Sequence, residues 1–390
     1  MRDYRQGSIA ALAAQTNRAL TFKTNHKDRL NDPPMPLETP MTAIPTKLEL
    51  QGGRVEVTAT DAAELIVDVF NRLGCPDDHS RAITDHLIDA NLCGVESHGV
   101  MRVMQYAERM QNGTMKVDVR PRLRTTETGV TEVDGGMGNG IPAMILAYET
   151  ATAHAAENGM AAIPVLNTGH TGRHGAFADE AAEKGFLTIC TGGGNHRVHG
   201  QVAPFGGSKG MLPTNPWCIG IPGGDCGPVV MDFATGKIAG GWIYAARSAG
   251  ALLPEDCVVD RNGNPTRDPE DYFNGGAILP MGGHKGFALS LMAELIGEAL
   301  IGPSSPECNW LLLAIDTKKF RKPDALQAAA EEVLDDLRKC PPAPGFDRVE
   351  IPGEREREQR RRSDGVIAIP DATWRQVIDL SKNLKRGHSG

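Results

Sequence analysis

The residues best suited to chemistry in this chain are histidines that lie beside glycines. Ser97 and His98 stand just before Arg102 and Tyr106, at the start of a helix predicted over residues 99–110. His98 and Arg102 are four apart, so a helix would place them on one face. An imidazole moves a proton near neutral pH, and a guanidinium can hold a carboxylate bidentately. This set suits a small acid substrate; the alternative is a surface histidine beside a solvated arginine.

A second candidate segment is Gly169-His170-Thr171-Gly172-Arg173-His174. It follows a strand predicted over residues 160–166 and precedes a helix predicted over residues 175–184. A histidine at the end of a buried strand points into a cleft in many enzymes. His170 and His174 also have the i, i+4 spacing that zinc sites use. Because no glutamate follows His170 and no third ligand is placed, we predict no metal site.

A third segment, Gly282-Gly283-His284-Lys285-Gly286, opens an apolar helix predicted over residues 286–300. Free backbone N–H groups at a helix start attract phosphate, and Lys285 adds a positive charge. This is a suitable place for the phosphates of a nucleotide. The spacing is not that of a P-loop, so an NTPase is disfavoured. The alternative is a plain glycine-rich cap.

A fourth segment, Gly138-x-Gly140-x-x-Ala143, matches the shape of a dinucleotide fingerprint. It follows a strand predicted over residues 126–133 and a turn at residues 134–136, and a helix predicted over residues 142–158 comes next. The following strand, however, ends at Asn167-Thr168-Gly169, without the acidic residue that would bind ribose hydroxyls. We therefore interpret the glycines as a turn before a helix.

Composition excludes several classes of protein. The chain has 390 residues with 41 Lys+Arg against 49 Asp+Glu, and no basic block stands apart from acidic neighbours, which argues against nucleic-acid binding. No apolar run approaches the roughly 20 residues that span a bilayer. The eight cysteines are scattered without a C-x-x-C pair, which indicates reduced intracellular thiols. We expect a cytoplasmic protein, with organellar import left open.

The order of expected elements indicates an α+β fold. Pro-rich residues 1–50 are interpreted as a flexible extension. Capping and apolar spacing then predict helices, whereas the middle of the chain mixes helices with short strands. We expect a discontinuous, mainly helical domain from residues 54–122 and 286–385, and a cofactor domain from residues 123–285. Further predicted elements are helices over 62–73, 77–93, 324–337 and 371–383, and strands over 186–190, 229–233 and 311–315.

Taken together, several segments resemble the malate/L-lactate dehydrogenase-like family. Its relatives include L-sulfolactate dehydrogenases, ureidoglycolate dehydrogenases and cyclic imino-acid reductases. The resemblance covers about residues 54–385, in the family's order. The segments that carry it are Gly94–Val100, Asn167–Gly172, Ala203–Gly207, Thr214–Pro216, Met231–Thr235, Gly282–Gly286 and Ile351–Glu354.

The resemblance implies an oxidoreductase that uses NAD or NADP and interconverts a small 2-hydroxy acid and its 2-oxo acid. It implies a non-Rossmann cofactor domain with a mixed or antiparallel sheet, and a homodimer. The implied catalytic residues are Ser97 and His98, with His170 as the proton-transferring histidine in some members. Arg102 would bind the substrate carboxylate, and Thr214 and Asn215 would line the substrate or nicotinamide pocket. Implied cofactor contacts are His170, Thr171, Gly172, Arg173, His174, Asp232, Phe233, Ala234, His284, Lys285, Pro352 and Gly353.

One residue departs from the family pattern. Ten residues beyond Asp232, imino-acid reductases tend to carry Asp and hydroxyacid enzymes often carry Lys, but this chain has Trp242. Trp can supply neither a carboxylate nor an ammonium. Two alternatives therefore stay open: an NADPH-dependent reductase of a cyclic imino acid, against which Trp242 weighs, and a nucleotide-binding homologue without turnover. The segment Gly192–His196 also adds an imidazole near the expected cofactor path.

Overall fold

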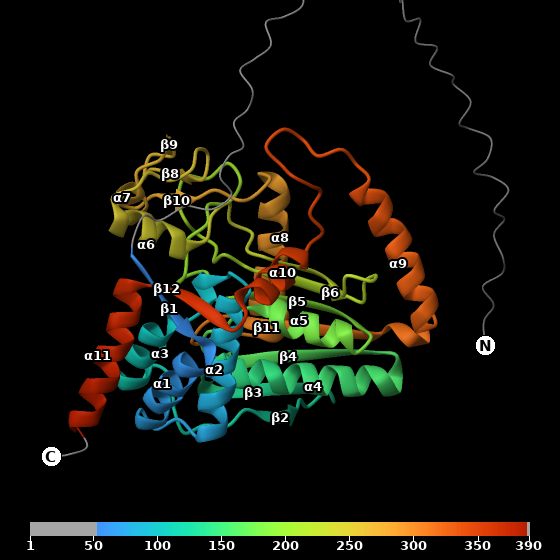
Figure 1. The fold of residues 1–390 in the computed structure, drawn as a ribbon, viewed down its shortest axis with the longest axis horizontal. Coiled ribbons are helices and arrows are strands. Elements are labelled where there is room, and N and C mark those ends of the chain that lie inside the picture. Colours follow the sequence, from blue (N-terminus) through green and yellow to red (C-terminus); the bar gives the residue numbers. More distant parts are fainter. Residues whose placement is uncertain (1–52, 388–390) are drawn as a thin grey trace, which may run out of the picture. The chain divides into compact units, whose positions relative to one another are not determined.

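The structure is a computed structural model that describes residues 53–387. The extension predicted over residues 1–50 lies outside the described residues. Within them the fold mixes helices and strands around a seven-stranded sheet (Figure 1).

The sheet has the strand order β2-β3-β4-β11-β5-β6-β7. β3 and β4 are parallel, and every other neighbouring pair is antiparallel, so the sheet is mixed, as predicted. β11, with the sequence NWLLLAID, lies between β4 and β5 and alternates buried with half-buried positions. The bounds are β2 Arg122–Thr125, β3 Thr131–Gly138, β4 Met160–Thr168, β5 Phe186–Gly193, β6 Trp217–Ile221, β7 Val229–Phe233 and β11 Asn309–Asp316.

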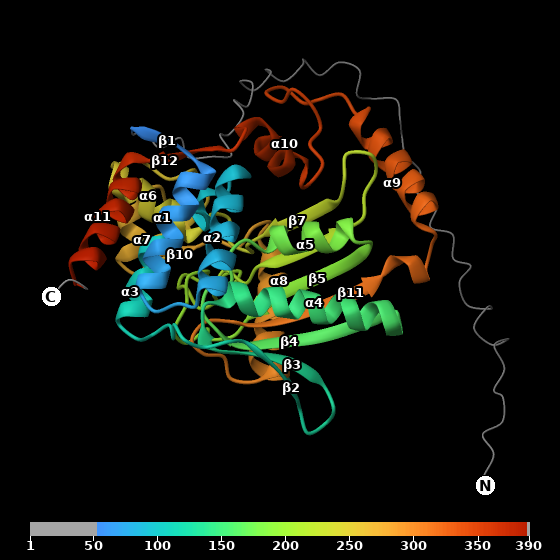
Figure 2. The same ribbon diagram turned by 60° about the horizontal axis from the view of Figure 1, so that its bottom comes forward.

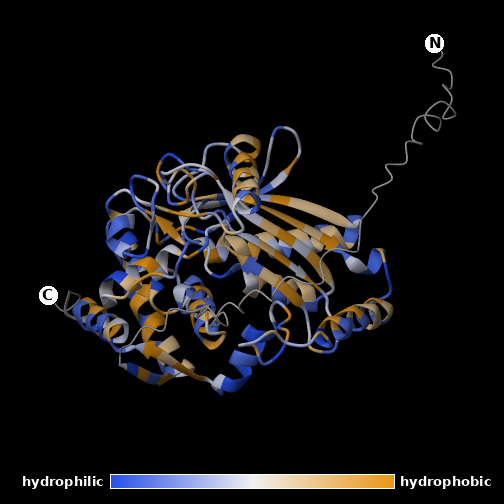
Figure 3. Ribbon diagram, turned by 90° about the horizontal axis from the view of Figure 1, so that it is seen from above, coloured by the Kyte–Doolittle hydropathy of each residue, from blue (hydrophilic) through white to orange (hydrophobic). Residues whose placement is uncertain are grey.

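Helices cover both faces of this sheet. α4 (Gly140–Asn158) packs on β3, β4 and β11, and α5 (His174–Glu183) packs on β5, β6 and β7. α8 (His284–Glu294) and the π-helix that continues it (η3, Leu295–Ile301) contact β5 and β11 from the opposite face. Figure 2 shows α4 and α5 lying along the strands, and Figure 3 shows that the strands of the sheet are largely apolar.

The first helices pack beside the C-terminal elements. β1 (Arg54–Thr58) pairs antiparallel with β12 (Val366–Pro370), and α1 (Ala59–Arg72) contacts α11 (Asp371–Gly387) (Figure 2). Residues from both ends thus build one cluster with α2 (Asp77–Leu92) and α3 (Arg102–Gln111). β11, which we assigned to the C-terminal segment of the helical domain, is a central strand of the sheet. The division into two domains stays a prediction.

The remaining elements lie outside these two groups. A small three-stranded sheet, with the order β10-β8-β9, carries α6 and α7, and α9 and α10 precede β12. Their bounds are α6 Gly240–Ala249, β8 Val258–Val259, β9 Pro265–Thr266, α7 Pro269–Phe273, β10 Ala277–Ile278, α9 Pro323–Arg338 and α10 Glu354–Ser363.

Some local predictions were wrong. The strand predicted over residues 126–133 begins only at Thr131, because residues 126–130 form the hairpin loop between β2 and β3. Residues 134–136 lie within β3 and do not form a turn. The α1 helix begins earlier than expected, because the Thr58 hydroxyl accepts a hydrogen bond from the Asp61 N–H and caps it. The third helix begins at Arg102 and not at Gly99.

Candidate active site

Two histidines that are 72 positions apart in the sequence meet in the structure. The imidazole rings of His98 and His170 stack with centroids 5.5 Å apart and an interplanar angle of 28°. His98 lies in a short 3₁₀ turn (η2, Glu96–His98) before α3, so it does not share a helix face with Arg102, contrary to our expectation. His170 follows the end of β4. Both side chains are half-buried.

Hydrogen bonds determine the tautomer of His170. Its Nδ1 atom accepts the backbone N–H of Gly172 at 3.2 Å, and the Tyr106 hydroxyl lies 2.7 Å from the same atom. A backbone N–H can only donate, so Nδ1 is an acceptor and the ring proton is on Nε2. His170 therefore presents a fixed N–H donor on its free side.

The contacts of His98 are less restrictive. Its Nδ1 atom lies 3.0 Å from the Ser97 hydroxyl, which can donate or accept. His98 can therefore hold a proton on either nitrogen or on both without losing this hydrogen bond. The Ser97–His98 pair was expected from the sequence, and the structure brings it against His170.

Arg102 lies beside this pair and not in bulk water. Its Nε donates to the Ser97 carbonyl oxygen at 2.7 Å, and its NH1 donates to the Gln105 side-chain oxygen at 2.6 Å. Arg102 forms no ion pair within residues 53–387, because the neighbouring acid, Glu307, pairs with Arg109. A half-buried guanidinium without a carboxylate partner suits an anionic ligand.

Burial controls the ionisation of the cluster. It lowers the pKa of His98 to about 3, with Arg102 as the next cause. Burial and then Arg102 lower the pKa of His170 well below its usual range. Burial also raises the pKa of Tyr106. At neutral pH both imidazoles are thus uncharged and the phenol keeps its proton, while Arg102 carries the positive charge.

The loop after His170 turns into the core. The Thr171 hydroxyl lies 2.8 Å from His174 Nε2, and the His174 ring stacks on Trp310 at a centroid distance of 4.1 Å. His174 is buried, and burial lowers its pKa to about 3. Arg173 is also buried; its NH2 donates to Asp89 at 2.6 Å. The buried residues that follow His170 therefore fix the position of this loop, and with it the position of His170.

The glycines that match the shape of a dinucleotide fingerprint are in contact with other parts of the protein. β3, α4 and β4 form a β-α-β unit, so the strand–glycine–helix shape is present. A Cβ added at Gly140 would lie 2.5 Å from the Gly169 carbonyl oxygen, and Gly140 N–H donates to the His170 carbonyl oxygen. Asn139 caps the next free N–H of α4. The start of this helix is occupied by the loop that carries His170, which supports a packing role for the glycines.

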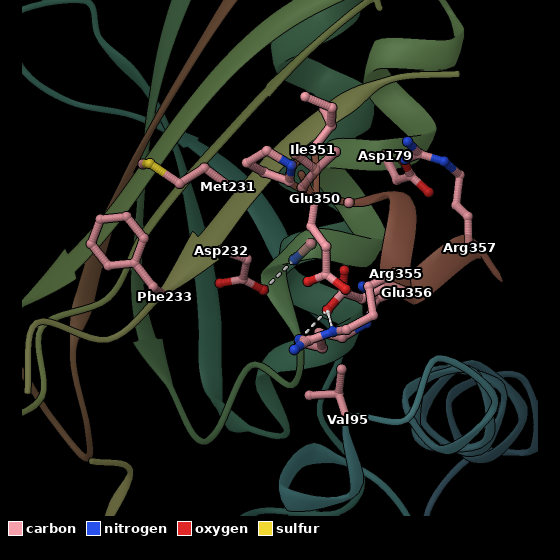
Figure 4. Close-up of a pocket in the computed structure, with 15 residues that line it drawn as sticks. Val95, Asp179, Met231, Asp232, Phe233, Glu350, Ile351, Arg355, Glu356 and Arg357 are labelled. Carbon is pink, nitrogen blue, oxygen red and sulfur yellow. Dashed lines mark hydrogen bonds and ion pairs between the residues drawn. The ribbon is translucent and has the colours of Figure 1, made fainter. Parts of the chain in front are cut away.

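A pocket of about 430 Å³ is lined by residues from the two segments that carry these histidines, although neither histidine lines it. Val95, three residues before His98, and Arg173, three residues after His170, both line it. Figure 4 shows residues from β7 on one side and from the segment before α10 on the other. Five predicted cofactor contacts line this pocket, although they are far apart in the sequence: Arg173, Asp232, Phe233, Pro352 and Gly353.

Charged groups of both signs surround the pocket. The Asp232 carboxylate accepts a hydrogen bond from the Gly175 N–H at 2.6 Å, at the start of α5. Part of the Asp232 residue is exposed to solvent, and protein atoms surround the rest. This burial raises the pKa of Asp232. Arg357 donates to Asp179 at 2.9 Å, and Arg355 pairs with Glu356 (Figure 4). The Nε atoms of Arg173 and Arg357 are buried without a hydrogen-bond partner.

Other predicted site residues lie elsewhere. Asn215 is fully buried, and its amide bonds Glu294 at 3.0 Å and Ser290 at 2.8 Å. The Thr214 carbonyl oxygen accepts from Thr235. His284 and Lys285 are exposed at the start of α8, where His284 contacts Phe205. Neither these residues nor Ala234, Thr171, Gly172 and His174 line the pocket, and their functional roles stay predictions.

Sequence reasoning missed several residues around the site. His86 accepts the Arg173 N–H at 2.8 Å, and Asp89 pairs with the Arg173 guanidinium. In the Arg-rich helix α10, Arg357 pairs with Asp179 and Arg360 pairs with Asp89. Only the alternation of Arg and Glu in α10 was visible in the sequence, and it does not reveal partners on distant helices.

Residues 53–387 contain no group of three or more His, Cys, Asp or Glu side chains arranged to hold a metal ion. No helix among them combines the length and apolar character needed to cross a membrane.

Comparison with known proteins gives the class of the fold. The solved structure of sulfolactate dehydrogenase from Methanocaldococcus jannaschii matches with a TM-score of 0.75 and 27% sequence identity, covering 85% of this chain and 98% of that one. The fold is thus that of a dehydrogenase with a mixed sheet. The family model for malate/L-lactate dehydrogenase matches residues 57–378, and the chain belongs to this oxidoreductase family.

Two curated relatives show the range of the family. L-lactate dehydrogenase from Cupriavidus necator is 30% identical over 346 residues, which cover 85% of this chain and 98% of the relative. A Δ1-pyrroline-2-carboxylate/Δ1-piperideine-2-carboxylate reductase from Pseudomonas putida is 34% identical over 259 residues, which cover 66% and 74%. The relatives thus match both the 2-hydroxyacid dehydrogenase prediction and its first alternative. Members of this family generally use a nicotinamide cofactor.

Proposed function

We propose that this protein interconverts a small 2-hydroxy acid and its 2-oxo acid with NAD or NADP. The observation that carries the proposal is the half-buried pair of His98 and His170 beside Arg102, a guanidinium without an ion-pair partner in the described residues. This arrangement supplies a proton carrier, a hydrogen-bond donor and a carboxylate anchor in one place.

The three side chains take different roles in this proposal. Arg102 binds the substrate carboxylate. The Nε2–H of His170 donates to the substrate oxygen at C2, because its Nδ1 is held as an acceptor by Gly172. His98 exchanges the proton, because its contact with Ser97 is compatible with both ring states. The lowered pKa keeps His98 neutral at pH 7, which is the form that accepts a proton from a hydroxyl.

We assign the dinucleotide to the pocket that Val95 and Arg173 line. Its volume of about 430 Å³ lies in the range of ligand sites. The exposed Arg355 is suited to phosphate, and Asp232 or Glu350 to ribose hydroxyls. A nicotinamide cofactor, when bound, supplies or removes the hydride. The non-Rossmann domain and the homodimer implied by the family resemblance are part of this proposal.

The test is a substrate panel assayed with both cofactors. Purified full-length protein is mixed with NADH or NADPH and a series of 2-oxo acids, and with NAD or NADP and the 2-hydroxy acids. We expect turnover of at least one acid pair, and loss of affinity for that acid in Arg102→Gln. Absence of turnover across the panel, with tight nucleotide binding by calorimetry, would favour the homologue without turnover. Light scattering in solution tests the homodimer.

A second candidate is reduction of a cyclic imino acid, favoured by the similarity to the Pseudomonas putida reductase. Trp242 argues against it, because the side chain is partly buried and packs against the apolar cluster that contains Val202 and Ile278. It brings no carboxylate to the site. NADPH oxidation with Δ1-piperideine-2-carboxylate, compared with pyruvate, separates the two functions.

A further inference from the structure

A buried carboxylate holds a third imidazole in the structure. Glu294, at the end of α8, is 6% exposed. It accepts the backbone N–H of Gly194 at 2.7 Å and that of His196 at 3.0 Å, and His196 Nδ1 lies 3.0 Å from the same carboxylate. The amide of Asn215 donates to it at 3.0 Å. Glu294 thus orients the His196 ring and the loop before it.

Close backbone contact makes this arrangement possible. A Cβ added at Gly193 would lie 2.0 Å from the Ala293 carbonyl oxygen, and one added at Gly297 would lie 2.1 Å from the Gly193 carbonyl oxygen. The end of β5 therefore lies directly on the junction between α8 and the π-helix that follows Glu294. π-Helical turns occur frequently at functional sites. The carboxylate of Glu298, in this π-helix, accepts the Asn195 N–H at 3.3 Å and holds the same loop.

The sheet places His196 on the same edge as the candidate active site. β4 and β5 are both antiparallel to β11, so they run in the same direction and their carboxyl ends lie on the same side of the sheet, where these strands end. His170 follows β4 by two residues, and His196 follows β5 by three. Val165 of β4 and Gly192 of β5 both pair with Trp310, so with one strand between them the two strands are about 10 Å apart at that level.

The segment before β11 connects the two places. Glu307 pairs with Arg109 and acts electrostatically on Arg102. On the other side of this segment, Asn195 donates to the Pro306 carbonyl oxygen at 3.1 Å. The loop of His196 and the helix of Arg102 thus contact the same short segment.

We propose that Glu294 and His196 bind the distal end of the substrate, so that the protein prefers 2-hydroxy and 2-oxo acids with a second carboxylate. With Nδ1 directed at Glu294, the free nitrogen is Nε2, for which no hydrogen bond occurs within residues 53–387. One third of the side chain is exposed, so Nε2 is accessible. A protonated imidazole donates a charge-assisted hydrogen bond to a carboxylate from this position. His196 is the contact and Glu294 the positioning residue.

This inference rests on the proposed function and is tested on acids that differ at the distal end. L-Malate has a carboxylate where L-lactate has hydrogen. We expect the wild-type protein to oxidise malate with the higher kcat/KM. His196→Gln removes the charged donor and should lower the malate-to-lactate ratio of kcat/KM roughly 10- to 100-fold. The change should appear mainly in the KM for malate, and lactate kinetics should change less than about threefold.

Two further variants sharpen the test. Glu294→Gln should reduce the ratio in the same direction, through the KM for malate and not through kcat, because the ring loses its anchoring carboxylate. His199→Gln is the matched control, because His199 lies in the same loop but faces the Pro306 carbonyl oxygen at 3.4 Å. Its ratio should match that of the wild-type protein, and circular dichroism confirms that each variant folds.

The outcomes separate this inference from the proposed function. A wild-type protein that prefers lactate, or a ratio unchanged in His196→Gln, overturns the role of His196 even when turnover is observed. If no acid of the substrate panel is turned over, the proposed function fails. Calorimetric binding of L-malate and L-lactate, which needs no turnover, then decides: selective loss of malate binding in His196→Gln supports the distal site, and equal affinities overturn it.

Discussion

Substituting each histidine of the stacked pair by glutamine should have unequal effects. His98→Gln removes the proton carrier, and general acid–base catalysis contributes about 10²–10⁴-fold, so kcat should fall by about that factor. His170→Gln keeps an N–H donor at the end of a side chain of similar length. The loss there is closer to that of one hydrogen bond, about 0.5–1.5 kcal/mol, or roughly tenfold and less.

The structure gives the reason for this difference. The Gly172 N–H, 3.2 Å from Nδ1, opposes a proton on that atom, so His170 cannot become doubly protonated without losing the contact. His98 faces only a hydroxyl, at 3.0 Å, which adapts to either ring state. Steady-state rates of the two variants and their pH profiles, measured with the acid pair found in the substrate panel, are the assay. A greater loss of kcat in His170→Gln than in His98→Gln would refute these assigned roles.

Three other variants and one change of conditions are informative. Arg102→Lys keeps the charge but loses the planar fork, and KM for the acid should rise about tenfold or more, with little change in unfolding; an unchanged KM contradicts carboxylate binding. Asp89→Ala leaves Arg173 buried without its partner and should lower the free energy of unfolding by about 3–5 kcal/mol in urea titrations. Glu180→Ala, which breaks an exposed pair, should cost less than about 1 kcal/mol. The pKa values of His86, His98, His170 and His174 are lowered in the folded protein, so on acidification the unfolded chain binds protons first. Acidification from pH 6.5 to 4.5 should therefore lower the free energy of unfolding by up to about 1.4 kcal/mol per pH unit for each of these imidazoles. A flat stability profile over that range contradicts the lowered pKa values.

Regular elements with clear apolar spacing could be predicted from the sequence. β7 was expected with its observed ends, and α2 and α4 were placed within two residues. These segments have strong local signals, namely buried runs bounded by glycine, proline or a capping residue. The strand predicted over 126–133 was wrong because a hairpin loop of residues 126–130 has no glycine until Gly129. Local patterns also could not indicate that β11 lies at the centre of the sheet, since strand order depends on contacts between distant residues.

The candidate site also has parts that the sequence predicts and parts that it does not. The histidines beside glycines and the glycine-rich segment before α4 could be recognised in the sequence. The contacts of that segment with the loop of His170 could not. The stacking of His98 on His170 joins residues from a helix start and a strand end, which no local pattern reports. Asp89 could not be found either, because a carboxylate on a helix surface has the same sequence signal whether it faces solvent or a buried arginine.

The contacts of Arg173 link the proposed nucleotide pocket to the histidine pair. Arg173 lines the pocket and follows His170 by three residues, its backbone N–H is held by His86, and its guanidinium is held by Asp89, which also pairs with Arg360 of α10. A ligand anion that binds Arg173 therefore acts on a loop whose other end positions His170. Since that loop is anchored at α2, and Arg360 of α10 pairs with the same Asp89, a shift of α2 would move the pocket wall and the His170 donor together.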